Sequence, residues 1–208
     1  PIVDEFATTG FRPIAKTTLP EFGLTATTEY SQTTGVDEIA RGHTANPWHT
    51  SHIAGGSSGG SAALVAAGVV PAAHANDGGG SIRIPAACCG LVGLKPSLGR
   101  LPLPYLAKNL PLQIVTEGIL TRSVRDTALV FAALERRTSM AKVLAQADEQ
   151  QLSRHGDPRH GVDLGLKAIG HVSAPIGRRL RIAMFTRRPD GEQADDACVD
   201  SVQDMVTA

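Results

Sequence analysis

Two glycine-rich segments of the chain place serine hydroxyls among closely spaced backbone N–H groups. Residues 55–61 read GGSSGGS and residues 77–81 read DGGGS. Acyl transfer requires a hydroxyl nucleophile, a group that takes its proton, and N–H donors directed at the oxyanion that forms on the attacked carbonyl. Glycine suits the third requirement because a backbone without side chains can approach a substrate closely. The pattern therefore indicates acyl-transfer chemistry, with Ser81 at the end of a donor array.

The spacing of the two segments favours one shared site. Between Ser57 and Ser81 the sequence predicts one helix, residues 58–67, and one strand, residues 69–75. A helix and a strand in succession can return the chain to the same place, so both loops can contribute to one site. A single glycine and serine loop would be interpreted more simply as a turn or an anion-binding nest.

The remaining elements expected from the sequence define an α/β chain. Strands are expected at residues 14–17 and 180–185, and residues 25–56 are expected to be loop. Ser123 and Asp126 have the spacing of a capping box ahead of apolar residues at helical intervals up to residue 134, which predicts a helix. A second helix is expected over residues 195–208, and residues 138–178 are interpreted as a peripheral or mobile segment.

The run from Gly55 through Arg100 resembles the signature of the amidase signature family nearly residue for residue. KTTLPEFG at residues 16–23 and TEGI at residues 116–119 are similar to the neighbouring blocks of that family, so the resemblance covers residues 1–135. It implies an α/β amidase signature fold in which part of a mixed β-sheet is flanked by helices. Residues 1–208 are expected to form one partial domain, incomplete at both ends, with the signature core at 55–100. The implied activity is hydrolysis of a carbon–nitrogen amide bond through an acyl-enzyme.

The resemblance also implies a role for individual residues. The nucleophile of the family falls on Ser81, and its relay serine falls on Ser57 after a cis Gly56–Ser57 peptide bond. The oxyanion donors would be three consecutive backbone N–H groups, those of Gly78, Gly79 and Gly80. Three further positions resemble supports around the reacting groups, and they are occupied by Ser58, Asp77 and Arg83.

The third member of the family's triad is a lysine that lies upstream of the block containing Lys16, and no residue of this chain matches it. Lys16 and Lys95 match other lysines of the pattern. The base must be a neutral amine to accept the serine proton through Ser57. We therefore interpret the chain as an internal portion of a longer family member and expect it to be weakly active or inactive alone. The alternative is a catalytically impaired family fragment that acts as a scaffold or partner subunit.

Three other interpretations compete with an amidase. GGSSG at residues 55–59 fits the G-x-S-x-G elbow of α/β-hydrolases, but residues 49–54 are mostly polar and are not the buried strand that an elbow needs. A phosphate-binding module requires Gly-Lys-Ser/Thr or G-x-G-x-x-G in a strand-to-helix turn, and the sequence has neither there. An aminoacyl-tRNA amidotransferase A-type subunit typically carries Gln where Ile84 stands. HANDGGG at residues 74–80 looks more like general amidases or cyclic amide hydrolases of the aminohexanoate type.

Nearby titratable residues are interpreted as structural. His74 lies close to the second loop, but a histidine in such a strand is more often packed than a base. Cys88 and Cys89 follow the nucleophile loop in an apolar setting and are expected to be core residues.

Composition narrows the partners and the compartment. Twenty basic and twenty acidic side chains give a net charge of +0, which argues against nucleic acid and anionic membrane as partners. The longest apolar stretch, residues 62–75, is too short to span a bilayer. Three cysteines, two of them adjacent, favour a reducing compartment, so we expect a cytoplasmic protein. We also expect no metal and no cofactor. The expected partners are a small-molecule amide and either a second copy or the missing part of the domain.

Overall fold

The computed structural model describes residues 2–33, 39–98, 100–101, 111–137, 183–187 and 190–207. It divides into two compact units, Pro1–Val172 and Ser173–Ala208. The segment 138–178, predicted to be peripheral, lies outside the described residues. A single partial domain over the whole chain stays a prediction. No helix in the described ranges is long and apolar enough to cross a membrane.

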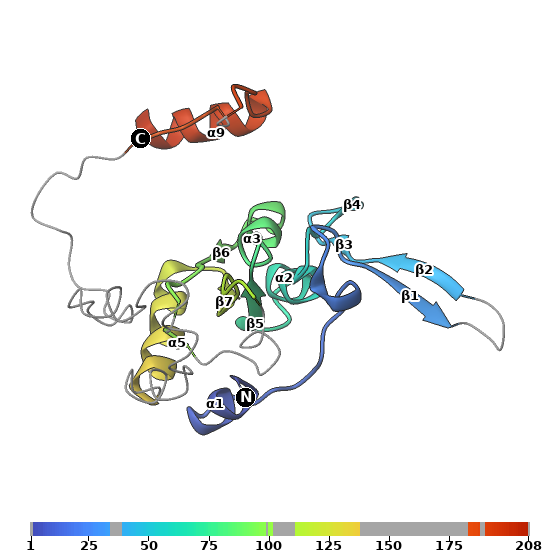
Figure 1. The fold of residues 1–208 in the computed structure, drawn as a ribbon, viewed down its shortest axis with the longest axis vertical. Helices are drawn as coiled ribbons and strands as arrows, with labels where there is room; N and C mark the ends of the chain where they lie inside the picture. The colour runs from blue at the N-terminus through green and yellow to red at the C-terminus, as the bar shows by residue number, and fades with distance from the viewer. Residues whose placement is uncertain are drawn as a thin grey trace, which may run out of the picture. The chain divides into compact units, whose positions relative to one another are not determined.

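The centre of the first unit is a three-stranded antiparallel sheet with the order β5–β7–β6 (Figure 1). Its strands are β5 (Ala72–Asp77), β6 (Val92–Gly93) and β7 (Thr116–Thr121). β7 is the middle strand of the sheet and is buried along its whole length. In the register His74 lies opposite Ile119 and Asp77 lies opposite Thr116. Asp77 is therefore the last residue of β5, directly before the second glycine loop.

Helices cover both faces of this sheet. Successive side chains of a strand point to opposite faces, so Ile119 and Leu120 of β7 enter different cores. Leu120 packs with residues of α2 (Gly59–Ala66) and α3 (Arg83–Cys89), whereas Ile119 packs with residues of α1 (Ile2–Thr8) and α5 (Val124–Arg137). The result is a three-layer α/β/α arrangement, which confirms the predicted α/β class (Figure 1).

The predicted helices are present with small shifts at their ends. α2 lies inside the predicted range 58–67, and α5 begins directly after Ser123. The Ser123 Oγ accepts a hydrogen bond from the Asp126 N–H at 3.1 Å and donates one to the Asp126 carboxylate at 2.8 Å, as the capping spacing predicted. In the second unit α9 (Asp196–Thr207) confirms the helix predicted over 195–208, and Val199 is its buried residue.

The prediction of loop for residues 25–56 is right at its two ends, residues 25–28 and 54–56, and wrong for four strands between them. β1 (Glu29–Thr33) pairs with β2 (Ile39–His43), and β3 (Ala45–Asn46) pairs with β4 (His49–Ile53), both antiparallel. Every residue of β4 is exposed, so the strand lacks the alternation of apolar and polar residues that marks a half-buried strand.

The strand predicted at residues 14–17 is wrong, and the strand predicted at 180–185 can be compared only over residues 183–185, because residues 180–182 lie outside the described residues. Residues 11–20 have no regular structure and lead into the short 3-10 turn η1 (Glu21–Gly23). The described part of the strand predicted at 180–185 is irregular, and only an isolated bridge joins Arg187 to Gln193 there. In both places the β-type composition has no neighbouring strand to pair with in the described residues.

Candidate active site

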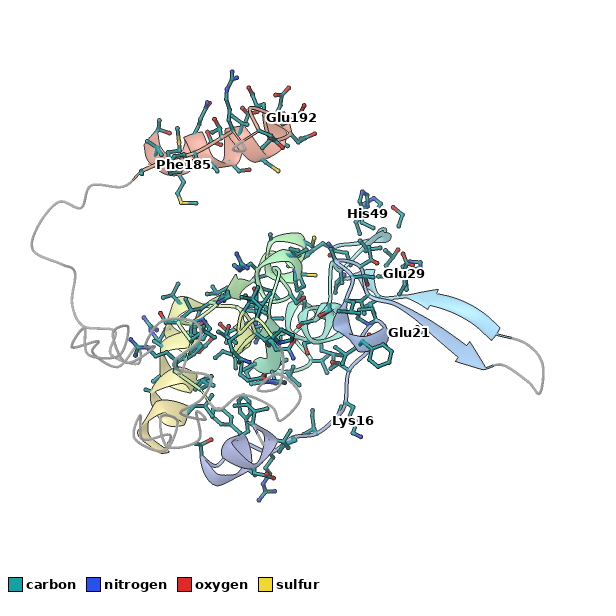
Figure 2. All side chains as sticks on the ribbon, viewed as in Figure 1. Lys16, Glu21, Glu29, His49, Phe185 and Glu192 are labelled. Carbon is teal, nitrogen blue, oxygen red and sulfur yellow. The ribbon has the colours of Figure 1, made fainter. Side chains whose placement is uncertain are left out.

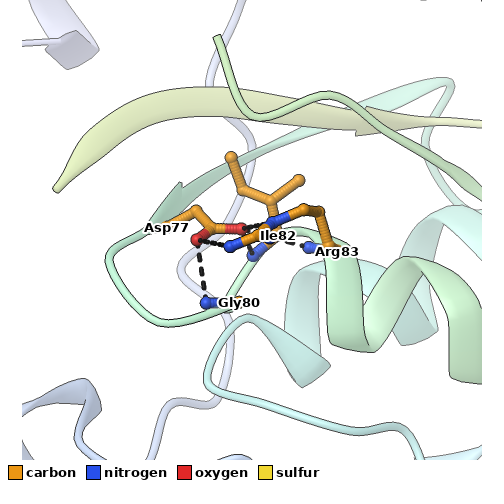
Figure 3. Close-up of polar contacts among 4 residues, drawn as sticks. All are labelled: Asp77, Gly80, Ile82 and Arg83. Atoms are coloured by element: carbon orange, nitrogen blue, oxygen red, sulfur yellow. Dashed lines mark hydrogen bonds and ion pairs between the residues drawn. The ribbon is translucent and has the colours of Figure 1, made fainter. Parts of the chain in front are cut away.

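The second glycine loop is folded around the Asp77 carboxylate (Figure 3). Oδ1 accepts hydrogen bonds from the Gly80 N–H at 2.8 Å and the Arg83 Nη2 at 2.9 Å. Oδ2 accepts from the Ile82 N–H at 3.2 Å, the Arg83 N–H at 3.4 Å and the Arg83 Nε at 2.9 Å. These five bonds tie the end of β5 to the start of α3. Ser81 lies between the residues they hold.

The electrostatics keep this anchor ionised. Burial alone would raise the pKa of the Asp77 carboxyl, but the hydrogen bonds from the Arg83 side chain and from the Ile82 and Arg83 N–H groups outweigh burial and lower that pKa. The same hydrogen bond raises the pKa of the Arg83 guanidinium. Asp77 is fully buried, whereas the Arg83 side chain is 54% exposed. Asp77 is thus a fixed negative charge under the loop rather than a proton donor.

The N–H groups of the three loop glycines differ in their hydrogen bonding. The Gly80 N–H is already directed at Asp77, so in this conformation it does not serve the oxyanion role expected from the resemblance. The Gly78 and Gly79 N–H groups make no hydrogen bond to any described residue. A Cβ built on Gly79 would meet nothing within 4 Å, so this part of the loop borders open space. Ser81 is half-buried at the end of this segment.

The first glycine loop buries Ser57. Ser57 is 2% exposed, and the Gly56–Ser57 peptide bond is cis, as the resemblance implied. A Cβ built on Gly23 would lie 3.4 Å from the Ser57 Oγ, so the η1 turn borders the hydroxyl. Ser58, also buried, occupies the N-cap position of α2.

The two glycine loops meet at α3. A Cβ built on Gly55 would lie 3.0 Å from the Pro85 Cα and 3.0 Å from the Cys88 Sγ, so the first loop packs directly on this helix. Because α3 starts two residues after Ser81, the segments that carry the two serines are neighbours. The described contacts include no hydrogen bond between the two serine hydroxyls. The structure thus brings the two loops together, but the described contacts do not include the hydrogen bond between Ser57 and Ser81 that a proton relay needs.

One buried residue at this junction was missed in the sequence. The Thr28 Oγ1 donates toward the carbonyls of Gly55, at 2.8 Å, and Ser57, at 3.2 Å, and it accepts a hydrogen bond from the Gly59 N–H at 3.0 Å. Thr28 is 1% exposed. The threonine-rich stretch at 25–28 has no periodicity that would have separated this side chain from its neighbours.

The lysines and the histidine near the signature make no described hydrogen bond to either serine hydroxyl. Lys16 is exposed on the irregular stretch between α1 and η1 (Figure 2), and no described hydrogen bond links Lys16 or Lys95 to either serine. His74 is on the α1 and α5 face of the sheet, opposite to the face of Asp77. Its Nε2 pairs with a carboxylate oxygen of Glu117, and the Phe6 ring packs edge-on against it with centroids 6.0 Å apart. The interpretation of His74 as a packed strand residue is confirmed.

The expectation for the adjacent cysteines is half right. Cys89 is buried, and burial, with a smaller effect of Cys88, raises the pKa of its thiol to about 11. Cys88 is exposed, so its assignment to the core is wrong. Adjacent residues of a helix point about 100° apart, and here the Cys89 side chain is directed into the core and the Cys88 side chain away from it.

Comparison with known proteins assigns the family. The amidase family profile matches residues 2–171. Over 179 residues the chain is 49% identical to AmiC of Mycobacterium tuberculosis, a protein assigned as an amidase, covering 86% of this chain and 31% of AmiC. It is 46% identical over 132 residues to the 6-aminohexanoate-cyclic-dimer hydrolase of Paenarthrobacter ureafaciens, covering 62% of this chain and 25% of that enzyme. The chain belongs to the amidase signature family.

The structural comparison agrees. A crystal structure of a bacterial aryl acylamidase of the amidase signature family superposes with a TM-score of 0.54 and 40% identity. The superposition covers 62% of this chain and 25% of the acylamidase. The chain therefore spans less than a third of the length of these relatives, and the described sheet and helices correspond to one part of an amidase signature fold.

Proposed function

We propose that this chain carries the nucleophile and the relay serine of an amidase that hydrolyses small-molecule amides through an acyl-enzyme. Ser81 is the nucleophile and Ser57 is the relay. The observation that carries the proposal is the Asp77 anchor, because its five hydrogen bonds fix the loop that carries both Ser81 and the Gly78 and Gly79 N–H groups. The packing of Gly55 on α3 supports a shared site for both serines.

The proposed reaction has two acyl-transfer steps. The Ser81 Oγ attacks the amide carbon, its proton passes to the Ser57 Oγ, and Ser57 passes its own proton to a base. The negative oxygen that forms on the attacked carbon accepts hydrogen bonds from the Gly78 and Gly79 N–H groups. Breaking the C–N bond releases the amine with the proton returned by the relay and leaves an ester on Ser81. Water then attacks this ester by the same route and releases the carboxylic acid.

The activity of this chain alone depends on a base that takes the proton from Ser57. In the family this base is a lysine, and no residue of the sequence matches it. A serine hydroxyl without a base is a weak nucleophile. We therefore expect the chain to react with a strongly electrophilic serine probe more readily than it turns over an amide.

The substrate class follows from the relatives. One relative is named for hydrolysis of a cyclic 6-aminohexanoate dimer, and one structural neighbour is an aryl acylamidase. Both names describe small amides, and we propose a substrate of this class. The cytoplasmic location and a homo-oligomeric or completed assembly stay predictions.

Reaction with a fluorophosphonate probe, followed by intact mass, tests the proposal. We expect one adduct on the wild-type chain, no adduct on Ser81→Ala, and slower labelling of Ser57→Ala. Ser97→Ala is the matched control because Ser97 is exposed and outside both loops. An unlabelled wild type, or labelling that persists in Ser81→Ala, would overturn the assignment of the nucleophile.

A further inference from the structure

Thr28 contacts the first glycine loop on both sides of Ser57. Its single hydroxyl proton faces two carbonyls, that of Gly55 at 2.8 Å and that of Ser57 at 3.2 Å. A lone pair of the same oxygen accepts the Gly59 N–H at 3.0 Å. One side chain therefore binds the backbone before, at and after the buried Ser57.

The loop is shaped around this side chain. A Cβ built on Gly59 would lie 2.3 Å from the Thr28 Oγ1, and a Cβ on Gly56 would lie 2.7 Å from the carbonyl oxygen of Thr27. Both distances are shorter than real side chains allow, so the two glycines permit the loop to lie directly on residues 27–28. The opposite side of the Thr28 backbone is also held, because its carbonyl accepts the Thr44 N–H at 2.9 Å.

We propose that Thr28 is a positioning residue that sets the location of the Ser57 hydroxyl. This inference rests on the proposed relay role of Ser57. Proton transfer requires donor and acceptor within hydrogen-bond distance, so a displacement of a few tenths of an ångström in the loop changes the transfer from Ser81. The described hydrogen bonds of the Thr28 hydroxyl go to the backbone of residues 55–59 and not to Ser81, so Thr28 acts through the backbone that carries Ser57.

Substitutions at residue 28 can separate the hydroxyl from the volume of the side chain. Valine has nearly the same shape but neither donates nor accepts, so Thr28→Val leaves the Gly55 carbonyl and the Gly59 N–H without this partner. Serine keeps the hydroxyl and lacks only the methyl group. Thr25→Val is the matched control, because the Thr25 side chain is exposed and, among the described residues, its hydroxyl donates to the Thr27 carbonyl at 2.8 Å and does not contact residues 55–59.

The test is a double-mutant cycle on the rate of fluorophosphonate labelling of Ser81. Alone, Thr28→Val is expected to slow labelling about ten- to a hundredfold, the range that a small misplacement of a reacting group produces. Thr28→Ser and Thr25→Val should label within about threefold of wild type, since the three loop contacts remain. In a Ser57→Ala background, Thr28→Val should cause no further loss, because the group it positions is gone.

The outcomes separate this inference from the proposed function. A wild-type chain that is not labelled contradicts the proposed function itself. A labelled wild type with an equally fast Thr28→Val overturns the positioning role, and so does an equal slowing by Thr28→Val with and without Ser57, which would mean general loop support. Circular dichroism establishes whether Thr28→Val folds. If it does not, Thr28→Ser decides, because slow labelling of a variant that keeps the hydroxyl contradicts the inference.

Discussion

Replacing Asp77 by asparagine tests the anchor of the second glycine loop most directly. Asparagine keeps the shape of the side chain and one oxygen, so the bonds from the Gly80 N–H and the Arg83 Nη2 can persist at that position. At the other position an NH2 group would face three donors, the Ile82 N–H, the Arg83 N–H and the Arg83 Nε. The asparagine NH2 group would then face these three N–H donors in a buried site, and none of them would have an acceptor.

The expected cost follows from these lost contacts. A buried donor without an acceptor costs about 1–3 kcal/mol, and a hydrogen bond that involves a charged group contributes about 1.5–3 kcal/mol. Half of the Arg83 side chain is exposed to solvent, so water can replace part of the hydrogen bonding that Arg83 loses. The ion pair between Arg83 and Asp77 therefore contributes less to the cost than a fully buried pair would. We expect Asp77→Asn to lower the free energy of unfolding by about 2–4 kcal/mol. For a chain of this length that is a decrease in Tm of about 4–16 °C.

Thermal unfolding followed by circular dichroism measures this shift. Glu21→Gln is the matched control, because it removes the same charge from an exposed side chain and should change stability by less than about 0.5 kcal/mol. Ser81 labelling should also slow in Asp77→Asn, since the loop loses its anchor. A Tm within about 2 °C of wild type together with unchanged labelling would refute the reasoning from the five hydrogen bonds.

Three further predictions concern pH, packing and capping. Because the pKa of Asp77 is lowered in the folded chain, its contribution to stability is complete above the unfolded value of about 3.9 and is lost as pH falls through the folded value. Below about pH 4, the free energy of unfolding measured in urea should therefore fall more steeply with decreasing pH for wild type than for Asp77→Asn. Gly118→Ala should destabilise by about 1–3 kcal/mol because its Cβ would lie 2.6 Å from the Cδ1 of the fully buried Ile82 and 3.1 Å from the Leu94 carbonyl oxygen. Gly79→Ala meets open space and should leave the Tm nearly unchanged. Ser123→Ala should cost about 1 kcal/mol in chemical denaturation through loss of the α5 cap, and an unchanged midpoint would contradict that role.

Sequence reasoning found the elements whose signal is local. α2 and α5 were predictable because a run of small residues and a capping pair mark them without reference to the rest of the chain. α3 was not, since it has seven residues and contains Pro85, which a sequence pattern treats as a break. Pro85 is tolerated because it is the third residue of the helix, where the N–H would have no partner within the helix.

Some features of the candidate site could be predicted from the sequence, and others depend on tertiary structure. The glycine loops and their serines are visible in composition, and the supporting position of Asp77 is implied by the resemblance. That the Gly80 N–H is taken by Asp77 depends on how the loop closes, which residue types alone do not specify. Thr28 acts on residues 55–59 across a long stretch of chain, so only tertiary structure reveals it.

The β3 and β4 hairpin has a consequence for how the two loops can move. Its Asn46 Nδ2 and Trp48 Nε1 donate hydrogen bonds to the carbonyls of Cys88 and Cys89, at 2.6 Å and 2.8 Å, so it is fastened to the last turn of α3. β4 continues through Ala54 into the first glycine loop. The hairpin thus connects the residues that precede Ser57 to the helix that follows Ser81. We therefore expect a displacement of α3 to move the residues that lead into Ser57 as well.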